Sequence, residues 1–344
     1  MLQVINSTPL PAALTVFSDP DGVECAYAAV KASFDISTGV PQLAGQQANF
    51  LAGDVYWGDP AQSSLRAAAD LTQDKPGTDI LLLGRAVAAS GPVRSMDLHL
   101  RVGPVRRSLR VFGDRHWLRA GSDWTISDPM AFERMPLRWE LAFGGQSQSS
   151  EGQPAEYEAR NPVGRGFIGS HETDFANRPL PNIEDPAALI SSPTDRPLPA
   201  GWGPIAPHWA PRVGWSGTYD DAWQRGRAPF LPRDFDRRFF NVAPPGLVTP
   251  ESLSGGEPVE LIGCTAGAPL RFTLPRVDIA LQWDFDGRLI PARPQIDTVL
   301  IEPDQGRLQL VWRARLVVDK RLARLRQVAV NARVAKESAD DAGR

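Results

Sequence analysis

The sequence predicts a mainly β protein. We expect an antiparallel β-sandwich-like core built from both chain ends, with a long irregular segment rich in proline and tryptophan wrapped over it. Three observations predict this fold. Short runs in the first 145 residues alternate between apolar and polar, prolines crowd the middle of the chain, and strand patterns return after about residue 258. The 344 residues, 42% of them apolar, are enough to bury a substantial core.

Residues 1–145 are predicted to be an N-terminal β-rich part. The run Ser95–Val102 places four apolar side chains on one face and four polar side chains on the other. This period of two is typical of a half-buried strand. Ala26–Phe34 and Ser108–Phe112 show a similar but less regular pattern, so we expect strands there too.

A short helical turn is expected at the end of this part. Asp128 is a good N-cap and Pro129 suits the first helical position, which predicts a turn that runs to Met135. The apolar run Leu137–Phe143 then predicts another strand, which ends at a pair of glycines.

Residues 146–250 form a different kind of segment. They hold 16 of the 32 prolines and four of the ten tryptophans. Proline breaks helices and central strands, so this segment is predicted to have no regular sheet or bundle. Its aromatic content is too high for a disordered linker, and ordered loops of this length are usually functional. Only the polar stretch 146–160 is expected to be mobile.

Residues 251–335 are predicted to be a C-terminal β-rich part that closes the same domain, followed by a frayed tail at 336–344. Asp286-Gly287 is a strong hairpin signal, and Asp304-Gln305-Gly306 predicts a second hairpin. The run Gln327–Val334 alternates again. Two stacked β halves remain an alternative arrangement.

Composition excludes several classes of protein. A net charge of −3 argues against a strongly basic nucleic-acid binder, and two cysteines are too few for a disulfide framework. The sequence has no apolar run long enough for a membrane span and no signal-peptide pattern at its first residues. We therefore expect a cytoplasmic protein with no nucleic-acid or membrane partner.

The search for catalytic motifs finds no nucleophile elbow and no cluster with metal-ligand spacing, so we expect no enzyme activity, no metal and no cofactor. Asp234 and Asp236 are the strongest exception, because glycosidases use two carboxylates and often have aromatic platforms. A carbohydrate-active hydrolase is therefore the alternative function. The competing interpretation is that these carboxylates form buried pairs with Arg233, Arg237 and Arg238 that hold irregular backbone together. Removal of one member of such a buried pair is expected to cost about 3–5 kcal/mol.

A series of ordered motifs carries a resemblance to a known family. They are Arg138–Gly145 (RWELAFGG), Asn161–Phe167 (NPVGRGF), Leu180–Glu184 (LPNIE), Pro199–Ile205 (PAGWGPI), Trp209–Arg212 (WAPR), Gly217–Trp223 (GTYDDAW) and Leu231–Asn241 (LPRDFDRRFFN). The sequence resembles a bacterial family of domains of unknown function encoded beside type VI secretion genes for VgrG spike proteins, PAAR-repeat tip proteins and effectors. The resemblance extends from Asn6 to about Trp312.

The resemblance implies a non-catalytic adaptor or chaperone. Such a protein binds a type VI effector or a PAAR protein, with VgrG as a further partner, and helps to load the effector onto the VgrG spike. A structural component that travels with the spike is another alternative. No catalytic residues follow from the resemblance.

Two sets of residues are the candidates for these roles. Aromatic side chains of the irregular segment are predicted to contact the partner, since such residues are enriched at binding hot spots; they are Trp202, Trp209, Trp215, Tyr219, Trp223, Phe230 and Phe235. The competing interpretation is that many of them form a second core. Polar residues of the motifs are predicted to be structural; they are Arg138, Glu140, Asn161, Arg212, Asp234, Asp236, Arg237 and Arg238.

Overall fold

The computed structural model describes residues 2–147 and 155–334. Strands dominate it, and several sheets pack into a sandwich-like arrangement, so the prediction of a mainly β fold is confirmed. The expectation of a frayed tail at 336–344 lies outside the described residues, as do residues 148–154 of the polar stretch 146–160.

The largest sheet joins the two chain ends. Its strand order is β2-β3-β22-β21-β7, with β4 paired to β3. In chain order these strands are β2 (Ala12–Ser18), β3 (Glu24–Asp35), β4 (Gln42–Leu43), β7 (Asp79–Leu82), β21 (Gln295–Glu302) and β22 (Arg307–Val317). The longest ladder pairs β3 with β22, and it joins residues 25–35 to residues 307–317.

Two further sheets also mix early and late strands. One has the order β1-β23-β19-β20 and the other β16-β10-β9-β17-β18. Their strands are β1 (Gln3–Asn6), β9 (Ser95–Val102), β10 (Val105–Phe112), β16 (Ile183–Glu184), β17 (Pro258–Ile262), β18 (Leu270–Thr273), β19 (Val277–Phe285), β20 (Arg288–Ala292) and β23 (Leu325–Val334). Each of the three sheets thus takes strands from both parts of the chain, which does not fit two separate stacked halves.

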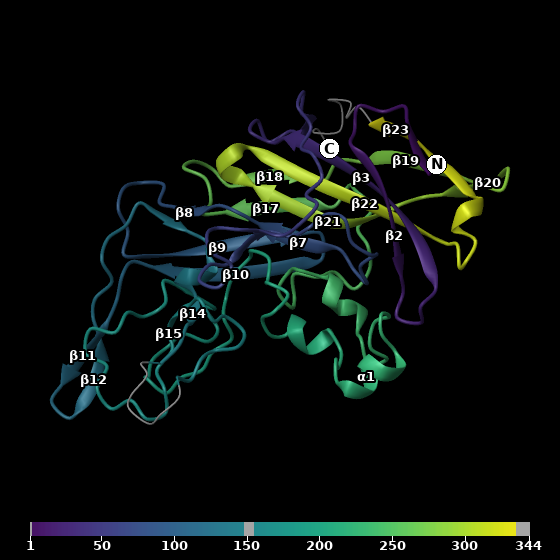
Figure 1. The fold of residues 1–344 in the computed structure, drawn as a ribbon. Helices are drawn as coiled ribbons and strands as arrows, with labels where there is room; N and C mark the ends of the chain where they lie inside the picture. The colour runs from purple at the N-terminus through teal and green to yellow at the C-terminus, as the bar shows by residue number, and fades with distance from the viewer. Residues whose placement is uncertain (1, 148–154, 335–344) are drawn as a thin grey trace.

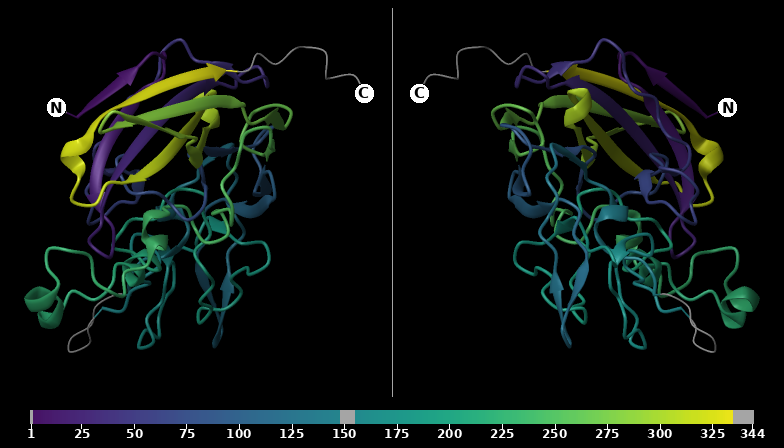
Figure 2. Two further views of the ribbon diagram at one scale, coloured as in Figure 1. Left: turned by 90° about the vertical axis from the view of Figure 1, so that its right-hand side faces the viewer. Right: turned by 90° about the vertical axis from the view of Figure 1, so that its left-hand side faces the viewer.

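The irregular middle of the chain lies below these sheets in Figures 1 and 2. Four two-stranded pairings of the described residues lie outside the three sheets: β5 (Val55–Tyr56) with β6 (Leu65–Ala67), β8 (Arg85–Val87) with β13 (Arg134–Pro136), β11 (Trp117–Ala120) with β12 (Asp123–Ile126), and β14 (Phe143–Gly144) with β15 (Arg165–Gly166), of which the last includes a strand of the irregular segment. The α-helix of the described residues is α1 (Asp221–Gly226), and short 3-10 turns are η1 (Trp139–Leu141), η2 (Arg212–Trp215), η3 (Arg237–Phe240), η4 (Pro303–Gln305) and η5 (Leu322–Arg324).

Both predicted hairpins are confirmed. Asp286 and Gly287 connect β19 to β20, and both have positive φ, as the tight turn between twisted strands requires. The second hairpin connects β21 to β22 through η4, and Gly306 provides the left-handed residue. The predicted strand at Ser95–Val102 matches β9, with Leu98, Leu100 and Val102 buried.

Two local predictions were wrong. Residues 128–133 contain no helical turn: the amide of Met130 donates to the Asp114 carbonyl at 3.0 Å, and Phe132 forms a β-bridge with Val93. Pairing with residues distant in the sequence therefore overrides the local cap signal. The strand expected over 137–143 is interrupted by η1. The sheets are also not purely antiparallel, since β1 with β23, β7 with β21, and β14 with β15 pair in parallel.

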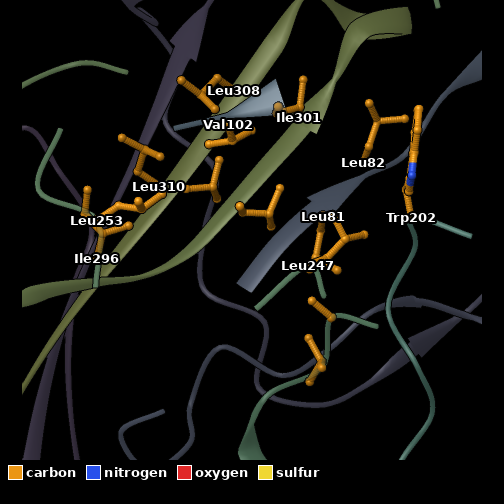
Figure 3. Close-up of a cluster of buried hydrophobic side chains, with 14 of the residues drawn as sticks. Leu81, Leu82, Val102, Trp202, Leu247, Leu253, Ile296, Ile301, Leu308 and Leu310 are labelled. Carbon is orange, nitrogen blue, oxygen red and sulfur yellow. The ribbon is translucent and has the colours of Figure 1, made fainter. Parts of the chain in front are cut away.

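The main core lies between the sheets, and the irregular segment contributes to it. Trp202 is 1% exposed and lies beside Leu82, whose amide donates to the Trp202 carbonyl at 3.0 Å (Figure 3). Leu247 joins the same cluster. Under the loops lies a smaller second cluster, formed by Trp117, Phe143, Phe167, Ile168, Phe175, Leu180 and Ile190. Burial of these large side chains is what orders a segment that has so little regular structure.

Candidate functional site

Two of the seven aromatic candidates are core residues. Trp202 and Trp209 are each 1% exposed. The Trp209 ring packs edge-on against Trp139, with 6.5 Å between the ring centroids, and its indole N–H donates to His208 at 3.0 Å. Neither side chain is available to a partner in this structure, so their prediction as contact residues is corrected. The motifs that contain these two tryptophans form part of the core.

The other five aromatic candidates lie on residues 215–240, which we call the hook segment. Asp220 caps α1 by accepting from the Trp223 amide at 2.8 Å. The Trp223 ring packs edge-on against Tyr219, and its indole N–H donates to the Phe230 carbonyl at 2.8 Å. Trp223 therefore fixes the shape of the hook segment, while Tyr219 (52% exposed) and Phe230 (41% exposed) face solvent.

The hook segment and strand β2 enclose a pocket of about 450 Å³, which we call the aromatic pocket. Its walls are mostly apolar, and they come from three regions distant in sequence. The lining residues are Val16, Phe17, Ser18, Gln73, Ser216, Tyr219, Pro229, Phe230, Leu231, Phe235, Phe239 and Phe240. The Phe235 ring packs against Phe240 with 5.3 Å between centroids, which keeps this wall rigid. Trp215 is half-buried outside the lining, where Arg238 lies over its ring.

Strand β2 lies at an edge of the largest sheet. The amide of Lys31 donates to the Pro11 carbonyl and the amide of Asp19 donates to the Val23 carbonyl, so odd-numbered residues of β2 bond to β3. In an antiparallel ladder the alternate residues turn their N–H and C=O groups away from that neighbour. Leu14 and Val16 consequently direct their backbone N–H and C=O groups toward the open edge, next to the aromatic pocket.

Asp234 and Asp236 hold backbone in place. Asp234 accepts from the Thr218 amide at 3.0 Å and from its hydroxyl at 2.7 Å. Asp236 accepts from the side chain and the amide of Arg238. These hydrogen bonds lower the pKa of both carboxyl groups below the ordinary value. The acid of a glycosidase needs a raised pKa, so this arrangement does not favour a carboxylate pair for hydrolysis.

Arg237 and Arg238 form ion pairs at the surface. Arg237 contacts Asp74, and Arg238 pairs with Asp236 at 2.6 Å; the arginine side chains are 40% and 60% exposed. The sequence suggested buried pairs that cost about 3–5 kcal/mol when broken. That expectation is corrected, because exposed pairs contribute about 0–1 kcal/mol.

The remaining motif residues contact loops distant from them in the sequence or backbone of the irregular segment. The side-chain amide of Asn161 donates to the carbonyls of Trp139 and Phe143, and Arg212 donates to those of Ile205 and Phe239. Elsewhere, Glu140 accepts from the amide and hydroxyl of Ser64, and Arg138 lies 3.8 Å from the ring centroid of Trp57. These contacts join loop to loop across long stretches of sequence.

The structure contains a second cavity that was not predicted from the sequence. It has a volume of about 350 Å³, lies on the face of β3 and β22 opposite the main core, and includes the buried cations Lys31 and Arg313. One signal in the sequence could have found it. Lys31 is one of only four lysines, and it interrupts the otherwise apolar run from Ala26 to Val30 and Ala32. A lysine inside a buried strand needs a partner or a ligand.

Residues 2–147 and 155–334 contain no group of three or more His, Cys, Asp or Glu side chains that could hold a metal ion. In the same part of the chain, no helix has the length and apolar character needed to cross a membrane.

The motifs that organise the irregular segment lie within a match to a family model. Residues 21–313 match a model described as an uncharacterized protein conserved in bacteria, DUF2169. The chain belongs to the DUF2169 family. The match begins after β2, and it covers the whole hook segment and all seven motifs quoted above. The chain matches no curated protein and no solved structure.

Proposed function

We propose that this DUF2169 protein is a non-catalytic adaptor that binds a type VI secretion effector or its PAAR-bearing region in the cytoplasm and helps to load it onto the VgrG spike. The observation that carries the proposal is the aromatic pocket beside an open sheet edge. The link to type VI secretion rests on the resemblance of the sequence motifs.

The occupant of this surface is an extended segment of the partner. Such a segment adds to a sheet edge by pairing its backbone with the free N–H and C=O groups, and its side chains enter neighbouring pockets. Leu14 and Val16 supply the free backbone groups of β2, and Phe230 and Phe235 supply the pocket wall. A large apolar side chain of the partner then packs among the rings, as at the hot spots of protein interfaces.

The position of the hook segment supports this use of the pocket. The Phe230 ring lies against Gly22 in the turn between β2 and β3, so closely that a Cβ atom at Gly22 would come within 3.1 Å of it. The pocket wall is therefore held to the same hairpin that presents the open edge. A preformed site of this kind loses less conformational entropy on binding.

The experiment is co-purification of the tagged protein with each PAAR, effector and VgrG protein encoded beside its gene. The wild type is expected to retain one of them in near-stoichiometric amount. The variant Tyr219→Ser/Phe230→Ser removes two exposed pocket rings and should lose the partner, while the melting temperature falls only slightly. Met130→Ser is the matched control, since Met130 is 67% exposed and lies outside the pocket lining.

A separate variant tests the strand edge. Val16→Pro removes one outward N–H group and leaves the ladder to β3 intact, because proline is tolerated at the solvent side of an edge strand. Weaker retention of the partner is expected. Failure of every neighbouring protein to bind, or full binding by the double pocket variant, would overturn the adaptor proposal. Recovery of the protein in the secreted spike fraction would instead favour a structural spike component.

A further inference from the structure

The cavity beside Lys31 is surrounded by basic side chains and apolar walls. Strands β3, β21 and β22 form its floor, and residues 48–70 cover it. Five cations line it, which are Lys31, Arg66, Lys75, Arg307 and Arg313. The apolar lining residues are Ala48, Leu51, Val55, Ala67, Ala68, Ala69, Leu81, Leu83, Val242 and Leu300. Its volume of about 350 Å³ falls in the range of small-molecule sites, about 300–1,000 Å³.

The charges around this cavity do not balance. Four of the five cations each pair with one carboxylate: Lys31 with Asp70 at 2.7 Å, Lys75 with Asp79 at 2.8 Å, Arg307 with Glu302 at 2.6 Å and Arg313 with Asp297 at 2.6 Å. Arg66 has no carboxylate within ion-pair distance among the described residues, and its guanidinium lies over the Trp57 ring. One positive charge is therefore left without a counter-charge.

Arg313 also has a donor without an acceptor. Its side chain is 2% exposed, its Nε donates to Asp297 and its Nη2 donates to the Asp70 carbonyl. Its Nη1 is buried and has no hydrogen-bond partner among the described residues. A buried charged donor without an acceptor is costly, so Arg313 adds an incompletely satisfied positive group to the cavity lining.

We propose that this cavity binds a small monocarboxylate with an apolar body. The carboxylate pairs with Arg66 and neutralises the one uncompensated charge of the lining. The apolar body lies against Leu51, Leu81 and Leu300. A single missing negative charge fits a carboxylate better than a phosphate dianion, which would leave the site negative. The carboxylate belongs to a free short-chain acid or to the C-terminus of a peptide with an apolar last residue.

Isothermal titration calorimetry of the full chain tests this with matched probes. Hexanoate is expected to bind at one site, hexanamide at least about tenfold more weakly, and inorganic phosphate not at all. A pentapeptide that ends in leucine with a free carboxyl group, compared with its amide, separates the two sources: tighter binding of the peptide acid than of hexanoate assigns the site to chain ends. No binding of either acid, or equal binding of hexanamide, would overturn the proposal.

Variants locate the binding. Arg66→Gln removes the uncompensated charge at an exposed position and should weaken hexanoate binding about tenfold, whereas Arg66→Lys should retain most of it. Arg106→Gln is the charge-matched control, because Arg106 is exposed on β10 outside the cavity lining. Ala68→Phe fills the cavity and should abolish binding.

Wild-type affinity in both Arg66→Gln and Ala68→Phe, with melting temperatures unchanged, would contradict the location. The proposal is independent of the adaptor function: Ala68→Phe should leave co-purification of the protein partner intact, and the aromatic-pocket variants should leave hexanoate binding intact.

Discussion

At the scale of single residues, Trp209 and Tyr219 are ten positions apart, yet only Tyr219 reaches solvent. Both lie in a segment with 16 prolines, where no helical or strand period assigns a side chain to a face. The residue types of a binding surface and of a core are the same aromatics. For this reason the sequence could predict an aromatic cluster but could not tell its buried members from its exposed ones.

These two residues should respond differently to truncation. Trp209→Ala is expected to lower the free energy of unfolding by about 3–5 kcal/mol, because it leaves a large cavity in the core. Tyr219→Ala should lower it by less than about 1 kcal/mol, since the ring is half exposed. Urea unfolding of both variants measures this. Equal losses would mean that the ring of Tyr219 packs as tightly as the core.

The Asp236 carboxylate should make stability depend on acid pH. Its pKa is lowered in the folded chain, first by the hydrogen bond from the Arg238 side chain. It therefore stabilises the folded state above its ordinary pKa of 3.8, and this contribution is lost as pH falls through the folded value. Because the pair is partly exposed, the effect is at most about 1 kcal/mol.

Unfolding of the wild type and Asp236→Asn at pH 7 and pH 3 tests this sign. The difference between the two proteins should be largest at pH 7 and shrink at pH 3. A difference that grows toward pH 3 contradicts the assignment.

At the scale of elements, the sequence predicted the tight hairpin turns correctly but did not predict pairing between distant segments. Asp286-Gly287 forms the predicted hairpin because the requirement for positive φ is met by two adjacent residues. The turn predicted after Asp128 also had a good local signal, but Phe132 pairs with Val93 instead. The cavity could not be predicted for a related reason. Its cations Lys31, Arg66 and Arg313 come from three separate elements, and of the three only Lys31 is unusual in its own stretch of sequence.

The hairpin offers a test with a matched control. Gly287 has a φ of +79°, and a Cβ atom there would meet nothing within 4 Å. Gly287→Ala should therefore cost about 1–2 kcal/mol from backbone conformation alone. Gly267 is equally free of neighbours but does not have a positive φ, so Gly267→Ala should change stability by less than about 0.5 kcal/mol. Equal losses of stability for the two variants in thermal unfolding would refute backbone conformation as the cause.

At the scale of the whole molecule, the sequence predicted that both chain ends share one β core, and each sheet does contain strands from both. The order of strands was not predictable, because the partner of a strand is chosen by complementary faces and not by nearness in the chain. The parallel pairs of β1 with β23 and β7 with β21 are examples, since each joins segments more than 200 residues apart.

This sheet order has a consequence for synthesis on the ribosome. Strand β3 is buried along ten of its twelve residues, and its longest ladder is with β22, at residues 307–317. While the chain grows, β3 can pair only with β2 and β4, and its remaining edge is open until residues 307–317 emerge. The central sheet therefore closes only once β22 has been made, and until then the nascent chain carries a largely apolar strand with one unpaired edge.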